Sequence, residues 1–176
     1  MSPTAIFNLH LILGYAAWAL CFTTYVWPWL KAMDPAKAQR AIATLHSFRF
    51  FGLVFILPGV VGSHLPTAFA TFAAYGDLAT GLLALLALAA FKRRPLFWLF
   101  TAAFNVVGVA DLIVTYYHGV TLDLPARAGE LGAAYAIPIL YVPLLMLTHC
   151  AALYLLVRGH RQDALQSLPA GGRPIR

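Results

Sequence analysis

Five ionisable side chains lie inside runs of apolar residues, where charged groups are rare. They are His46, Arg49, Asp77, Asp111 and His149. An Asp or Arg at the centre of a membrane-spanning helix costs at least about 2.5–3.5 kcal/mol, so such residues normally face other helices and pair with one another. They also mark functional sites in membrane proteins. These five residues are therefore the candidates for chemistry in this chain.

The positions of the five residues along the predicted helices indicate one shared site. Counted at about 1.5 Å per residue from the Lys- and Arg-bearing ends, Arg49 and His149 lie roughly 12–14 Å deep, and His46 lies about 5 Å shallower. Asp77 and Asp111 lie about 21–22 Å deep by the same count. We therefore predict that the two carboxylates form a layer just beyond the layer of Arg49 and the histidines.

The predicted site divides into acid–base and ligand-binding residues. Carboxylic acids and imidazoles are the usual proton donors and acceptors in enzymes, so Asp77, Asp111, His46 and His149 are the predicted catalytic residues. The predicted ligand-binding residues are Arg49, Asn105, Tyr75 and Tyr141.

Two helix faces support an inward-facing site. The residues that share a face with Asp77 are small, which lets neighbouring helices approach closely beside its carboxylate. These residues are Ala73, Ala74, Thr80, Gly81 and Ala84. A polar stripe, formed by Thr101, Asn105, Gly108, Asp111 and Thr115, covers about a third of the helix that carries Asp111. We expect both faces to point toward protein.

The charges of the site do not balance. In a purely structural interpretation, Arg49 pairs with Asp77 or Asp111, and the histidines bind Asn105 or a backbone carbonyl. One arginine cannot neutralise two carboxylates, so the second carboxylate still needs a protonated histidine, a bound cation or a proton of its own. This imbalance favours a site that binds or exchanges something.

The composition indicates that most of the protein's surface is in contact with lipid. Hydrophobic residues make up 61% of the 176 residues and charged residues only 10%, against roughly a quarter charged in soluble domains. The fold class we predict is all-α, a polytopic bundle of five transmembrane helices forming a single domain at residues 1–160. The predicted spans are 6–30, 41–62, 67–91, 96–117 and 133–157, with a closing glycine cap at His118-Gly119. Residues 161–176 lack an apolar pattern and are predicted to be a disordered cytoplasmic tail.

The distribution of Lys and Arg predicts the orientation of the bundle. Of the twelve, three lie in the first connection, three in the third and four in the tail, all on one side of the membrane. Cytoplasmic loops carry such an excess, so we expect the N-terminus outside and the C-terminus in the cytoplasm of a bacterial-type inner membrane. The lipid bilayer accounts for the net charge of +6, and no nucleic-acid partner is needed.

Three functions fit these residues. The first is a pocket that binds a lipophilic small molecule, isoprenoid- or sterol-like, or acts on it by acid–base chemistry. The aromatic residues support this function, but they suit helix packing equally well. The second is a small b-type cytochrome with His46 and His149 as axial haem ligands. The third is a proton- or cation-coupled transporter, with a purely structural membrane subunit as the remaining alternative.

Several properties stay open at the level of sequence. The ligand, the reaction, the cofactor and the formation of a homo-oligomer are not determined by any motif. No Walker motif, nucleophile elbow or H-E-x-x-H is present. His10, His64 and His118 lie near the outer interface without carboxylate or cysteine spacing, so we predict no metal site there.

Overall fold

The structure of the chain is a computed structural model that describes residues 1–166, with side chains described through Arg158. Over this range the chain is helical and contains no β-strand. Its elements are α1 (Pro3–Cys21), η1 (Phe22–Val26), α2 (Trp27–Ala32), α3 (Pro35–His46), η2 (Ser47–Ile56), α4 (Thr67–Ala89), α5 (Arg94–Thr121), η3 (Leu124–Tyr135), η4 (Ile137–Tyr141) and α6 (Val142–Gln166).

Four helical segments are long and apolar enough to cross a membrane. They are Pro3–Ala32, Thr67–Ala89, Arg94–Thr121 and Ile137–Arg158. The first joins α1, η1 and α2, and the last joins η4 to most of α6. The chain is therefore an all-helical protein with the helices of a membrane protein, and these segments match the first, third, fourth and fifth predicted spans.

The second predicted span differs in its bounds and helix type. Residues 41–62 were expected to form one helical span whose far end is kinked or loosened at Pro58-Gly59. Instead, α3 begins at Pro35, and the chain continues after His46 as the 3-10 helix η2. The helix ends at Ile56. Pro58 lacks an N–H and Gly59 has a φ of 82°, a conformation that favours glycine, so the chain turns at these two residues instead of extending to Gly62.

The predicted end of α5 at His118-Gly119 is wrong. The helix continues to Thr121, and the residue with a left-handed conformation is Asp123, whose φ is 53°. Asp tolerates this conformation better than most residues because its short side chain can bond locally. The following connection, expected as a loop, contains the 3-10 segment η3 with a kink at Gly132.

The last helix extends beyond its predicted end at Val157. α6 runs to Gln166, so the first residues of the predicted tail are helical. The remainder of that tail, residues 167–176, lies outside the described residues.

Local sequence explains where the first helices begin and change. Ser2 and Asp34 cap α1 and α3, since their side-chain oxygens accept backbone N–H groups of the first turn, and a proline follows each. The π-helical turns η1 and η4 each lie next to or contain a proline, Pro28 or Pro138. A missing N–H removes one α-helical hydrogen bond, which favours a widened turn at these places.

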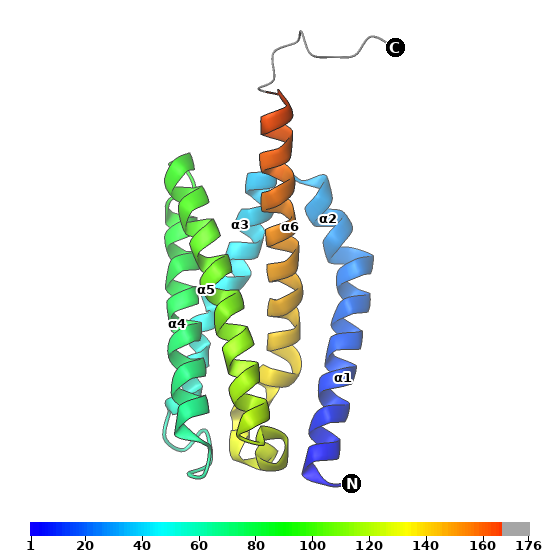
Figure 1. Ribbon diagram of the computed structural model, residues 1–176, viewed down its shortest axis with the longest axis vertical. Helices are drawn as coiled ribbons and strands as arrows, with labels where there is room; N and C mark the ends of the chain where they lie inside the picture. Colours follow the sequence, from blue (N-terminus) through cyan, green and yellow to red (C-terminus); the bar gives the residue numbers. More distant parts are fainter. Residues whose placement is uncertain (167–176) are drawn as a thin grey trace.

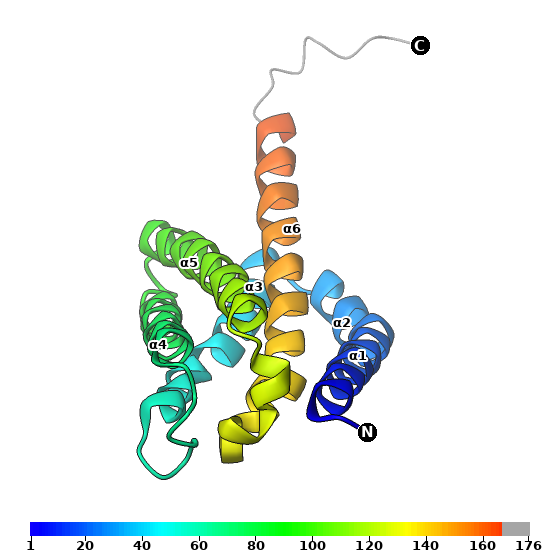
Figure 2. The same ribbon diagram turned by 60° about the horizontal axis from the view of Figure 1, so that its bottom comes forward.

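The helices form two groups on either side of α6. α4 and α5 run side by side on one side, and α1 lies on the other, in both views (Figure 1, Figure 2). α3 packs against α4 and α6, and Gln39 of α3 donates a hydrogen bond to the carbonyl of Ala152 in α6.

Two apolar clusters fill the bundle. One contains Phe7, Phe55, Phe69, Leu131 and Ile137, and the other contains Leu30, Ile42, Phe97, Phe104 and Ala152. Along α4 the first cluster reaches Ala74 and the second begins at Ala84, with the buried Asp77 between them. The polar residues therefore lie between two apolar layers.

Candidate functional site

The 3-10 helix η2 places the central side chains of the site on one buried face. With three residues per turn, side chains at i and i+3 eclipse one another. His46 at its start, Arg49, Gly52 and Phe55 are accordingly all buried, while Phe48, Phe50 and Phe51 between them are exposed. Runs of 3-10 helix longer than three or four residues are uncommon and often accompany function or strain.

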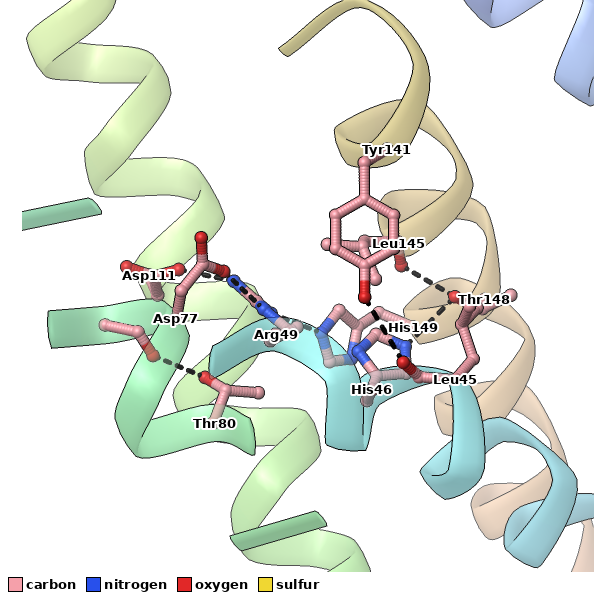
Figure 3. A network of polar contacts seen from close by, with 11 residues as sticks. Leu45, His46, Arg49, Asp77, Thr80, Asp111, Tyr141, Leu145, Thr148 and His149 are labelled. Carbon is pink, nitrogen blue, oxygen red and sulfur yellow. Dashed lines mark hydrogen bonds and ion pairs between the residues drawn. The ribbon is translucent and has the colours of Figure 1, made fainter. Parts of the chain in front are cut away.

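Arg49 joins the two carboxylates. It is fully buried, and its Nε donates to Asp77 Oδ1 at 2.6 Å while its Nη2 donates to Asp111 Oδ2 at 2.5 Å. The three side chains come from η2, α4 and α5 (Figure 3). One cation therefore holds two acids from neighbouring helices, and both predicted helix faces point inward.

A chain of hydrogen bonds extends from the other side of Arg49 and determines the protonation state of His149. Asn105 Nδ2 donates to the carbonyl of Thr101 at 2.8 Å, so Asn105 Oδ1 is left to accept from His149 Nδ1 at 2.9 Å. His149 Nε2 then accepts from Arg49 Nη1 at 3.1 Å. Because one ring nitrogen donates and the other accepts, His149 is neutral and carries its proton on Nδ1.

His46 packs against His149, and its hydrogen bonding determines its protonation state in a similar way. The two ring centroids are 4.0 Å apart. Thr148 donates its hydroxyl proton to the carbonyl of Leu144 at 2.8 Å, so it accepts from His46 Nε2 at 3.0 Å. Nδ1 of His46 is buried and has no hydrogen-bond partner among the described residues. A proton there would have no acceptor, so His46 is also neutral.

Three glycines make room for these polar groups. A Cβ on Gly52 would overlap the carboxylate of Asp77, one on Gly76 would overlap that of Asp111, and one on Gly108 would overlap the ring of His149. A glycine inside a helix destabilises it by roughly 0.5–1 kcal/mol relative to alanine. The cost is offset where the missing side chain lets a buried charged group lie against the backbone.

A cavity of about 140 Å³ adjoins the carboxylates. It lies between α1, α4, α5 and the segments η3 and η4, and its lining is mostly apolar, with polar groups from Asn8, Asp77, Asp111, Thr115 and Tyr116. Beside it, the hydroxyls of Tyr15 and Tyr116 form a hydrogen bond of 2.6 Å that links α1 to α5. The two acids therefore form the polar end of an apolar chamber.

The structure does not bring all predicted site residues to the cavity. Asp77 and Asp111 line it, whereas neither His46 nor His149 does, since Arg49 lies between the histidines and the carboxylates. The acid–base roles of the histidines stay predictions, and in this arrangement their contacts position Arg49.

The two predicted tyrosines lie outside the network. Tyr75 is 56% exposed and points away from the carboxylates, because it sits two residues from Asp77 on the opposite face of α4. Tyr141 donates to the carbonyl of Leu45 at 3.3 Å and borders a separate, open apolar groove (Figure 3). Neither residue contacts the chamber.

The role of Thr148 and the spacing role of Gly52 and Gly76 were not predicted from the sequence. A signal for the glycines was present, because glycine inside an apolar helix is unfavourable unless something approaches the backbone closely. No comparable signal marks Thr148, since a threonine inside a helix commonly bonds to its own backbone.

The histidine pair does not fit a haem. A haem iron between two imidazoles would need a free nitrogen on each ring, about 2 Å from the metal, and space for the macrocycle between them. The rings are already in contact, and both Nε2 atoms are engaged, one with Arg49 and the other with Thr148.

The outer histidines make separate local contacts. His10 Nδ1 lies 3.0 Å from the Tyr135 hydroxyl, and burial raises the pKa of that phenol, so Tyr135 stays protonated and can donate. The ring of His118 packs edge-on against Phe72. Among the residues whose side chains are described, 1–158, no three His, Cys, Asp or Glu residues gather as metal ligands.

Fold and site together define a class, an all-helical protein whose four apolar helices are long enough to cross a membrane and which contains a buried Arg–Asp–Asp centre. The chain belongs to the family described as "Domain of unknown function (DUF8737)", whose model matches residues 6–157. The matched range includes the four apolar helices except their outermost residues, and the whole polar network. No curated protein and no solved structure matches the chain.

Proposed function

We propose that this chain is a five-span protein of a bacterial-type inner membrane whose chamber binds a lipophilic small molecule. The observation that carries the proposal is the apolar cavity of about 140 Å³ with Asp77 and Asp111 at one end. Binding sites for small molecules are concave and mostly apolar, with a few polar groups that orient the ligand. An ion-pair network serving only to join helices has no need of an adjoining chamber.

The size of the chamber limits what enters it. An apolar cavity of about 150 Å³ holds a benzene molecule, so this chamber accommodates a group of that size. A whole sterol or isoprenoid chain is larger. We therefore assign the chamber to one end of a lipophilic molecule, whose remaining part extends between the helices into the surrounding lipid.

A fifth span is consistent with the length of α3 and η2. At about 1.5 Å per residue in an α-helix and 2.0 Å in a 3-10 helix, the continuous run from Pro35 to Ile56 is about 38 Å long. The hydrocarbon core of a bilayer is about 30 Å thick. The run carries Lys37, Arg40 and Arg49, which makes it less apolar than the other four segments.

The proposed orientation places the Lys- and Arg-bearing end in the cytoplasm. The end of α2, the start of α3 and the end of α4 are drawn uppermost in Figure 1. Lys31 belongs to the last turn of α2 and Lys37 to the first turn of α3, and Lys92 follows the end of α4. A reporter that is active only outside the cytoplasm should work when fused after Gly119 and fail when fused after Arg94 or Arg161. The reverse pattern would invert the orientation.

The binding function is tested by filling the chamber. Ala73 of α4 is buried and lines it, whereas Ala79 of the same helix is exposed. The variant Ala73→Phe places a benzyl group inside the chamber without changing any charge, and Ala79→Phe adds the same group on the outer surface as a matched control.

The measurement is mass analysis of small molecules that co-purify with each full-length protein in mild detergent. We expect a molecule bound to the wild type and to Ala79→Phe, and its loss from Ala73→Phe. Equal retention by Ala73→Phe would show that the molecule binds elsewhere. If the wild type retains nothing and added benzene leaves its melting temperature unchanged, the binding function is excluded.

A further inference from the structure

The charges at the end of the chamber leave one negative charge without a partner. Arg49 is the only cation in contact with Asp77 and Asp111 among the residues with described side chains. His149 and His46 are neutral, because each ring uses one nitrogen as a donor and leaves the other as an acceptor. With both carboxylates ionised, the centre carries a net charge of −1.

One carboxylate oxygen at this end of the chamber is buried without a hydrogen bond. Asp111 is only 5% exposed, and its Oδ1 is buried with no partner in the described part of the chain, whereas its Oδ2 binds Arg49. Thr115, one turn further along α5, also has a buried hydroxyl without a partner. Both residues line the chamber, and buried polar groups are rarely left unpaired.

We infer that the end of the ligand held in this chamber is a protonated amine on an apolar body. This inference rests on the proposed binding function and adds the chemical class of the ligand. An ammonium group offers three donors and a positive charge, which match Asp111 Oδ1, Thr115 Oγ1 and the unbalanced carboxylate. The apolar body then contacts the aliphatic and aromatic lining, including Phe7, Phe69 and Leu112.

Other classes of ligand match the chamber less well. An anion would be repelled by the excess negative charge. A neutral alcohol donates one hydrogen bond to an acceptor but leaves the excess negative charge of the carboxylates unbalanced. A bare divalent cation takes about six or more oxygen ligands, and the fully buried oxygens without a partner at this end are, among the described residues, Asp111 Oδ1 and Thr115 Oγ1.

Benzylamine and benzyl alcohol form a matched pair of probes, since they share the ring that fits the chamber and differ in charge. Their dissociation constants are measured by NMR or calorimetry on the full chain in detergent at pH 7. We expect benzylamine to bind the wild type at least roughly tenfold more tightly, which corresponds to about 1.4 kcal/mol. The variant Asp111→Asn should remove this preference while keeping the affinity for benzyl alcohol, and Ala73→Phe reports non-specific uptake of both probes.

The outcomes separate the two proposals. Equal affinity of the wild type for both probes overturns the amine inference and leaves the chamber as a binding site. Failure of both probes to bind better to the wild type than to Ala73→Phe overturns the binding function as well. If Asp111→Asn does not fold, Thr115→Val is used in its place. An unchanged preference for benzylamine in Thr115→Val would show that the amine does not bind at this end of the chamber.

Discussion

The two sides of Arg49 are built differently. On one side, which we term the histidine side, Arg49 donates to His149, His149 donates to Asn105, and Asn105 donates to the backbone carbonyl of Thr101. On the cavity side, Arg49 meets Asp77 and Asp111, and one carboxylate oxygen of Asp111 has no partner within the described residues.

This difference assigns the positioning of Arg49 to the histidine side and ligand binding to the cavity side. The buried atoms left without partners on the histidine side, such as His46 Nδ1 and Thr101 Oγ1, belong to neutral groups that do not line the chamber. On the cavity side, the buried unpaired oxygens of Asp111 and Thr115 both line the chamber, and the first belongs to an acid. A completed network holds Arg49 in one geometry, and an incomplete one leaves an acceptor for a molecule that enters the chamber.

Removing Arg49, the residue that both sides share, should have the largest effect on stability. Arg49→Ala leaves two carboxylates buried without their cation, and breaking a buried ion pair in this way costs about 3–5 kcal/mol. We expect a large fall in melting temperature in detergent. His10→Ala is the control, since His10 is exposed and makes one hydrogen bond at the bundle's end. Equal melting temperatures for the two variants would contradict a buried network.

A double-mutant cycle sharpens the description of the cavity side. Asp77→Asn or Asp111→Asn alone should cost little stability, because Arg49 keeps one carboxylate and the excess negative charge disappears. The single variant Asp77→Asn should still fold while binding its ligand weakly. The double variant leaves Arg49 buried without a counter-ion, so it should be less stable than the sum of the single effects by about 1–3 kcal/mol. Additive changes in the free energy of unfolding would show that Arg49 is balanced by another group.

The smallest expected difference compares one residue from each side. Asn105→Ala strands the donor at His149 Nδ1 and should cost about 1–3 kcal/mol, since a buried donor loses its acceptor. Thr115→Val removes a hydroxyl that has no partner in the described structure, so its effect should stay below about 1 kcal/mol. Thermal unfolding of both variants measures the difference, and a larger loss for Thr115→Val would reverse the assignment of the two sides.

Much of the fold follows from local properties of the sequence. Apolar runs of sufficient length predict where spanning helices lie, and the structure has four such helices where the sequence places them. The five ionisable residues were identified because charge is unfavourable among apolar neighbours, and the structure joins Arg49, Asp77, Asp111 and His149 by hydrogen bonds. The exact helix ends were predicted less well, because α3 begins at Pro35 and α5 continues past His118-Gly119 to Thr121.

The sequence by itself determined the apolar segments and the charged residues within them, because hydropathy is a property of each segment alone. Only the tertiary structure decided that η2 is a 3-10 helix, that Tyr75 faces outward, that the histidines are neutral, and that a chamber adjoins Asp111 but neither histidine. These features depend on how each helix is rotated and how closely its neighbours approach. A cavity or an unpaired oxygen arises between segments, so no single segment contains the information that specifies it.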